Sequence, residues 1–151
     1  MNIHKSILAL EKAIPFYEQH QKGVSAKNVA WHLDHSLKVI NSVCDRLKTS
    51  KPENYKSTFS LIKFYIFLRG RIPRGKAVAP ESVVSNEEIL KSSIESQLAL
   101  AKINLQEINN LPAKSNFQHP YFGKLSLKKS QHFLAIHTNH HLAIVNDILI
   151  K

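Results

Sequence analysis

Four long segments of this chain repeat apolar residues at intervals of three and four, the spacing that puts them on one side of an α-helix. These segments cover residues 2–20, 25–48, about 85–109 and 126–151. The clearest is 25–48, whose apolar side carries Val29, Leu33, Leu37, Ile40, Cys44 and Leu47. Outside an ambiguous apolar run at residues 59–68, no segment alternates with the two-residue period of a strand. The pattern therefore predicts an all-α fold.

Length and composition indicate one folded unit. A chain of 151 residues has room for a single domain, which we place at residues 1–151. Hydrophobic residues make up 43%, and only four glycines and six prolines are present, which excludes collagen-like and disordered classes. The four long helices predict a four-helix bundle, to which a short extra helix at residues 57–69 and a long basic crossover loop at 70–80 are added. The short helix is apolar on most sides, so we expect it to be buried.

Local signals mark the ends of these elements. Pro15 is expected to kink or end the first helix, because proline has no N–H to donate. Ser25 or Asn28 can cap the second helix, and Pro112 follows the third. Residues 115–126 contain proline and glycine and are predicted to form a turn-rich connection without strands.

The charge of the chain is strongly positive and unevenly spread. Lysine and arginine number 21 against 11 acidic residues, for a net charge of +10. Residues 54–80 contain no acid, and the basic residues there are Lys56, Lys63, Arg69, Arg71, Arg74 and Lys76. Nucleic acid, an anionic membrane surface or an anionic small molecule would suit this balance. We do not expect nucleic acid, because no helix-turn-helix, zinc finger or aromatic-basic motif accompanies the charge.

Other features bear on compartment and on the ligands open to a metal. The N-terminal residues lack the order of a secretory signal, and the run at 59–68 is too short to span a membrane. We therefore expect a cytoplasmic protein without a membrane partner. Because Cys44 is the single cysteine, any metal site must use histidine or carboxylate ligands.

Three of the nine histidines fall within five residues, at His137, His140 and His141. His137 and His141 are four residues apart, so on a helix their imidazoles lie one above the other, as two ligands of one ion would. They share a face with the apolar residues Leu134, Ile144, Val145 and Ile148, and so point inward. His140 points roughly 100° away from them.

A second cluster, Trp31-His32-Leu33-Asp34-His35, lies in the second helix. Helical phase puts His32 on the flank of the apolar side and turns His35 nearly opposite. His32, His137 and His141 would make three ligands and leave open positions, as catalytic metal sites do. His35 is the alternative first ligand, and a buried polar network without metal would need the same spacing.

Two motifs together resemble the DinB-like metal-binding bundle superfamily. They are His119-Pro120-Tyr121-Phe122-Gly123 and the later His137-Thr138-Asn139-His140-His141, which look like the HPxFG loop and HxxHH helix of a branch of unknown function. The resemblance implies a four-helix bundle that holds a divalent metal, zinc or nickel, on three histidines. It assigns His137 and His141 as ligands, with His32 in the preferred register and His35 in the alternative one. The motif loop is expected to border the site.

The resemblance also implies a class of chemistry. Members of the superfamily include thiol-dependent transferases and isomerases, so we expect a metal-activated water or thiol acting on a small molecule, as in a thiol S-transferase or hydrolase. We expect the substrate to be anionic or a low-molecular-weight thiol, with the basic loop as the site that receives its charge. Asp34 is expected to be a surface charge or a partner of a histidine, and Tyr121 a packing residue. A non-catalytic metal-binding protein, homodimeric through an apolar face, and a basic nucleic-acid-binding module are the alternatives.

Overall fold

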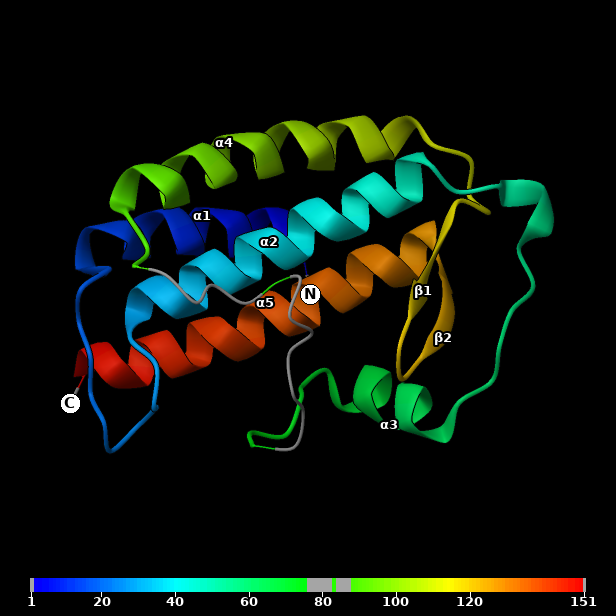
Figure 1. Ribbon diagram of the computed structural model, residues 1–151. Coiled ribbons are helices and arrows are strands. Elements are labelled where there is room, and N and C mark those ends of the chain that lie inside the picture. The colour runs from blue at the N-terminus through cyan, green and yellow to red at the C-terminus, as the bar shows by residue number, and fades with distance from the viewer. Residues whose placement is uncertain (1, 76–82, 84–87, 151) are drawn as a thin grey trace.

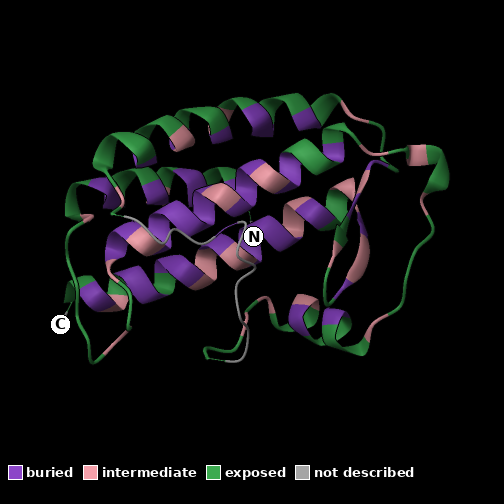
Figure 2. Cartoon of the chain, in the orientation of Figure 1, coloured by how far each residue is buried: buried purple, intermediate pink, exposed green. Residues whose placement is uncertain are grey.

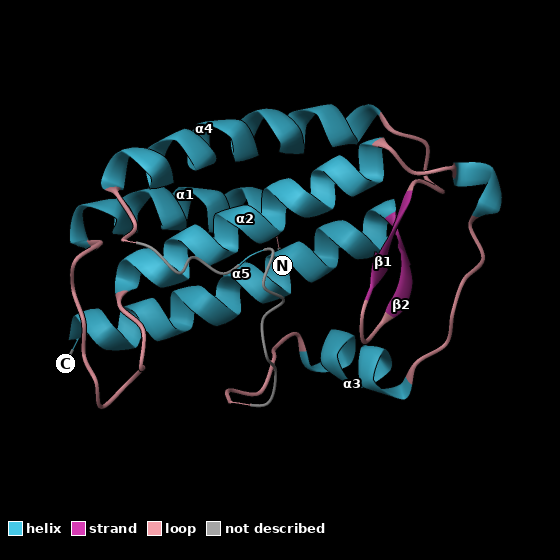
Figure 3. Ribbon diagram, in the orientation of Figure 1, coloured by secondary structure: helices cyan, strands magenta, loops and turns pink. Residues whose placement is uncertain are grey.

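The computed structural model describes residues 2–75, 83 and 88–150 of the chain (Figure 1). Most of these residues are helical, and a small two-stranded sheet accompanies the helices (Figure 3). The helices are α1 (Ile3–Ala13), α2 (Val29–Lys48), α3 (Leu61–Arg69), α4 (Lys91–Glu107) and α5 (Leu127–Ile150), and the strands are β1 (Asn116–His119) and β2 (Gly123–Ser126). Short 3₁₀ turns lie at Ile14–Phe16, Pro52–Asn54 and Ile108–Asn110.

Helices α1, α2, α4 and α5 lie lengthwise beside one another and enclose the core (Figures 1 and 2). Helix α2 packs against both α4 and α5, and its whole predicted apolar side is fully buried. The mostly helical architecture predicted from the apolar period is therefore confirmed. Burying each large aliphatic side chain stabilises the fold by about 1.5–3 kcal/mol, which makes this shared core the main support of the helices.

Several helix ends differ from those that the periodicity suggested. Helix α1 ends at Ala13 and a 3₁₀ turn containing Pro15 follows, as the missing N–H of proline predicts. Helix α2 begins at Val29 rather than residue 25, because the Asn28 side chain accepts a hydrogen bond from the backbone N–H of Trp31 at 3.0 Å. The predicted start of the third long helix, residues 85–87, lies outside the described residues, and α4 begins at Lys91.

The connection before α5 forms an antiparallel hairpin, so the prediction that it has no strands was wrong. Phe117 pairs with Leu125, and these two side chains are the buried residues of the hairpin strands. With one buried residue in each four-residue strand, the sequence shows too little alternation to reveal the sheet. The hairpin packs on α2 and α5 and so closes one end of the helical core.

Gly123 begins β2 with a φ of 68°, a left-handed conformation that other residues rarely adopt. A Cβ at this position would also overlap the Oγ1 atom of Thr58. We expect Gly123→Ala to lower the free energy of unfolding by about 1–3 kcal/mol, measured by urea denaturation. Gly23→Ala is the matched control, since no atom lies within 4 Å of its added Cβ, and equal stability losses in the two variants would contradict this role of Gly123.

Helix α3 lies apart from the four long helices, near the hairpin (Figure 1). Ser60 caps its start, and Gly70 ends it with a φ of 64°. Only Lys63 and Ile66 of this helix are buried, so the expectation that it is buried on most sides was wrong. Part of the predicted basic loop, residues 76–80, lies outside the described residues. No helix in the described part of the chain is both long and apolar enough to cross a membrane.

Candidate functional site

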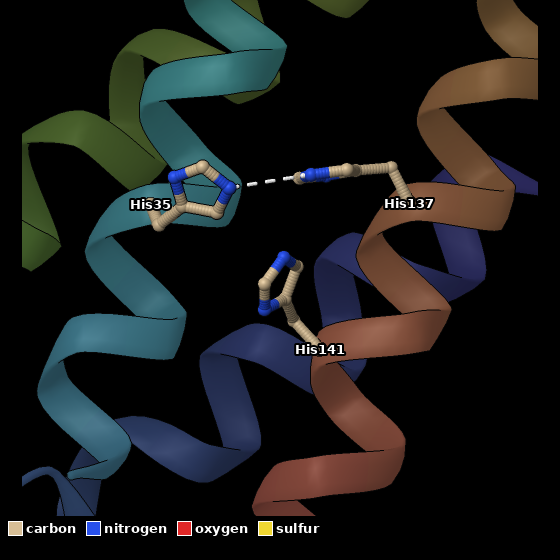
Figure 4. A group of neighbouring side chains, drawn as sticks. All are labelled: His35, His137 and His141. Carbon is tan, nitrogen blue, oxygen red and sulfur yellow. Dashed lines mark hydrogen bonds between the residues drawn. The ribbon is translucent and has the colours of Figure 1, made fainter. Parts of the chain in front are cut away.

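Three imidazoles from two helices converge in the space between those helices (Figure 4). His35 comes from α2, and His137 and His141 come from successive turns of α5. One nitrogen of each ring can be chosen so that all three nitrogens lie within 4.8 Å of one another. The three rings turn toward one another, as ligands of a single ion do. We call these three residues the histidine triad.

A backbone contact fixes which nitrogen of His35 can accept a proton or a metal. The Nδ1 atom lies 2.9 Å from the carbonyl oxygen of Val83. A carbonyl oxygen only accepts, so Nδ1 must carry the proton and donate it. The Nε2 atom of a neutral His35 is then a bare lone pair, and it lies 3.3 Å from Nε2 of His137 (Figure 4).

His32 supports the triad through His141. Their Nδ1 atoms lie 3.0 Å apart, so one of them must donate to the other. On the far side of the His32 ring, Nε2 lies 3.0 Å from Oγ of Ser25. When His141 donates to His32, and His32 donates onward to Ser25, the Nε2 lone pair of His141 is left for a ligand. Such outer hydrogen bonds orient metal-binding histidines in many proteins.

His137 has an unusual environment for a polar ring. Its Nδ1 atom is buried and has no hydrogen-bond partner in the described structure. The ring of Phe133 lies on one side, with ring centres 5.6 Å apart. The described polar contact of this imidazole is therefore made by its other nitrogen, Nε2, which faces His35. A buried nitrogen without a partner is costly, and a strong interaction at the opposite nitrogen would offset that cost.

Trp31 forms a wall of the site. Its ring stacks on His35 with 4.9 Å between centres and 9° between planes. The same indole meets the edge of His32, at 5.2 Å and 89°. Trp31 thus holds both histidines of α2 in place and adds an apolar surface beside the triad, although its Nε1 atom is buried without a described partner.

Burial keeps the histidines of the site neutral. Desolvation lowers the pKa of His32 to about 4 and lowers the pKa of His35, with nearby positive charge adding to the effect at His32. The pKa of His137 and that of His141 are lowered further, first by burial and then by the other histidines. Neutral imidazole is the form that binds a metal ion, so near pH 7 the triad needs no deprotonation before binding.

One nitrogen pair of the triad has the separation of two ligands of one metal ion. Two nitrogens bound to one zinc ion at about 2.0–2.1 Å, with an angle of roughly 90–110° between the bonds, lie roughly 2.8–3.4 Å apart. The observed 3.3 Å between Nε2 of His35 and Nε2 of His137 falls in this range. The same distance is long for a direct hydrogen bond. Imidazole nitrogens are ligands for transition-metal ions, whereas calcium and magnesium prefer oxygen ligands.

The structure brings His137 and His141 together, as predicted, and joins them with His35 in the compact triad. His32, the first ligand preferred from helical phase, contacts His141 instead through the outer Nδ1 pair. The interpretation that His35 points nearly opposite His32 was wrong, because both side chains are buried. Residues three apart on an α-helix lie only about 60° apart around its axis, so His32 and His35 face the same side of α2.

The other residues considered from the sequence have structural contacts. Asp34 is buried rather than at the surface: Gln97 donates to it at 2.6 Å, and it pairs with Lys38 at 3.0 Å. Nδ1 of His119 accepts hydrogen bonds from the backbone N–H groups of Tyr121 and Phe122, at 3.1 and 3.2 Å. His119 therefore shapes the hairpin turn, and Phe133 lies between its ring and His137.

A cavity of about 340 Å³ lies between α5 and the chain that follows α3, and no triad residue is part of its lining. Its lining includes Arg71, Arg74, Asn139 and His140. The ring of His140 contacts that of His141, with centres 5.1 Å apart, so the cavity is adjacent to the histidine cluster. Arg74 pairs with Asp147 at 2.8 Å. A second cavity, of about 370 Å³, is lined by α1 and α4 residues and includes no histidine.

Several parts of the site were not identified from the sequence. Ser25 was considered only as a helix cap, and Trp31 only as a neighbour of His35. The carbonyl of Val83 carries no side-chain signal at all and lies 48 positions from its partner. A mixed cluster of one tryptophan and two histidines within five residues was the signal that could have identified Trp31. The contacts of Ser25 and Val83 depend on tertiary structure.

Comparison of the chain with protein-family models, with curated proteins and with solved structures finds no match.

Proposed function

We propose that this protein is a metal-dependent enzyme of the DinB-like type, which holds one zinc or nickel ion on His35, His137 and His141. The observation that carries the proposal is the convergence of three neutral imidazoles within 4.8 Å, from two separate helices. The resemblance of the HPYFG loop and the HTNHH helix to the superfamily supports it, as does the arrangement of the four long helices. In this assignment His32 orients His141 and is not itself a ligand.

Each protein group has a definite task in this proposal. The Val83 carbonyl keeps the proton of His35 on Nδ1, and His32 with Ser25 can keep that of His141 on Nδ1. Trp31 and Phe133 exclude water from the rings they cover. A divalent ion bound at the triad would lower the pKa of a coordinated water or thiol and so supply a nucleophile near neutral pH.

The cavity beside His140 is the place we propose for the substrate. Its volume of about 340 Å³ suits a small molecule. Arg71 and Arg74 line it, and Arg71 is exposed, so a carboxylate or phosphate group on the substrate would meet positive charge there. A small thiol with an anionic group, or an anionic hydrolysable compound, combines this charge with the chemistry of the triad.

Turnover after metal loading tests the proposal. Protein without a histidine tag is loaded with zinc or nickel and assayed with a panel of small thiols paired with electrophiles, and with small esters. We expect turnover that a chelator abolishes and that His141→Ala reduces at least about a hundredfold, with exposed His4→Ala as the matched control. Metal bound in full without turnover on any panel member would contradict the enzyme and leave a non-catalytic metal-binding protein.

A further inference from the structure

Helix α3 presents a continuous apolar stripe to solvent. Leu61, Phe64, Tyr65 and Leu68 stand at the i, i+3, i+4, i+7 spacing of one helix face, with exposed fractions of 74%, 61%, 48% and 73%. Phe59, just before the helix, is 81% exposed and extends the apolar surface. We call these five residues the α3 stripe. Apolar residues scattered singly over a surface are ordinary, whereas contiguous exposed apolar patches mark sites of interaction with proteins or membranes.

The opposite face of α3 anchors it to the protein. Ile66 is buried, Phe67 contacts the rings of Phe122 and His132, and Lys63 donates a hydrogen bond to the carbonyl of Thr58. The helix therefore has two apolar sides, one packed on the hairpin and α5 and one directed outward. An isolated helix of nine residues would be marginal in water, so this packing is what displays the outer stripe as a formed surface.

The surroundings of the stripe are positively charged. Lys56, Arg69 and Arg71 are exposed around it, and the chain contains no acidic residue between positions 54 and 80. Arg69 lies over the ring of Tyr65, with its guanidinium carbon 5.1 Å from the ring centre. Lys128 and Lys129, at the start of α5, are also exposed, and Lys129 is close enough to act on Lys63. The apolar stripe is thus flanked by cations.

The apolar stripe and the cations around it together favour one kind of binding partner. A second copy of the chain, docked through the same stripe, would bring two sets of cations together. A bilayer with anionic headgroups instead offers opposite charge around an apolar interior. From the stripe and its charged rim we infer that α3 is a membrane-surface helix, which lies in the headgroup region of an anionic bilayer with Leu61, Phe64 and Leu68 directed toward the acyl chains. This departs from the sequence-based expectation of no membrane partner, and it is independent of the metal site.

Vesicle co-sedimentation tests the inference. The full chain is mixed with vesicles of phosphatidylcholine, or of phosphatidylcholine with phosphatidylglycerol, at low and at physiological salt. We expect binding to the anionic vesicles only, weakening as salt rises. The double variant Leu61→Ser, Leu68→Ser should bind at least about tenfold more weakly, because each leucine would move its apolar surface from water into the bilayer. Arg69→Gln with Arg71→Gln should weaken binding by about fivefold for each residue.

The control variant is Leu100→Ser with Ile103→Ser on α4, two apolar residues outside α3 that are 47% and 53% exposed, and it should bind the vesicles as the wild type does. Circular dichroism establishes that all variants fold. Equal binding to both kinds of vesicle, or equal losses in the α3 and α4 variants, would overturn the inference. Absence of vesicle binding together with a concentration-dependent dimer that Leu61→Ser, Leu68→Ser dissociates would also overturn it, in favour of a second copy on the stripe.

Discussion

His35→Asn is expected to weaken zinc binding by several hundredfold, while His32→Asn leaves the affinity within about tenfold of the wild type. Structural zinc sites with four ligands bind with about 10–16 kcal/mol, which corresponds to roughly 2.5–4 kcal/mol for each ligand lost. Asparagine can reproduce the hydrogen bond of a histidine Nδ1 but has no atom at the position of Nε2. The Nε2 atom of His35 lies 3.3 Å from Nε2 of His137, whereas the Nε2 atom of His32 faces Ser25.

The pair of asparagine variants separates a ligand from a residue that orients one. In His32→Asn the side-chain oxygen can still accept from Nδ1 of His141, whereas His32→Ala removes that partner and should cost about ten- to a hundredfold. Affinities come from competition with a chromophoric chelator at fixed pH. The opposite order, with His32→Asn severe and His35→Asn mild, would make His32 the ligand and His35 the supporting residue.

Acid is expected to unfold the metal-free protein in the range where its buried histidines would charge. The pKa of His32 and that of His119 are each lowered by burial from 6.5 to about 4. As the pH falls below 6.5, the unfolded chain takes up these protons first, so the free energy of unfolding decreases. The loss accumulates from about pH 6.5 to about pH 4 and, at 1.36 kcal/mol per pKa unit, amounts to about 3 kcal/mol for each of the two residues.

Urea denaturation at a series of pH values between 8 and about 4 measures this loss. His119→Asn is the informative variant, because an asparagine oxygen can accept from the Tyr121 and Phe122 N–H groups and does not titrate. It should flatten the profile by about 3 kcal/mol, while exposed His4→Asn leaves it unchanged. A wild-type stability that is constant down to pH 4 would show that these histidines charge without cost.

The main helices could be predicted because each buries one side. Leu33, Leu37 and Ile40 recur at helical spacing in α2, and all three are fully buried. The hairpin could not be predicted, since Phe117 and Leu125 each stand alone in a four-residue strand. The outward stripe of α3 was misinterpreted for a related reason: periodicity shows that a face is apolar but not what covers it.

The candidate site was predicted in part. The i, i+4 spacing of His137 and His141 fixed their common direction on α5, and the structure agrees. Helical phase could not decide between His32 and His35, because residues three apart lie only about 60° apart around a helix and so face the same side. The position of Val83 against His35 brings together residues 48 apart in the chain and could come only from the tertiary structure.

The metal content of the untagged protein tests the central claim most directly. After incubation with zinc and removal of free ions, elemental analysis should find one ion per chain in the wild type and in His4→Ala. It should find almost none in His141→Ala, with circular dichroism showing that this variant keeps its helices. Full zinc content in folded His141→Ala would contradict the account, because the ion would then be held somewhere other than the histidine triad.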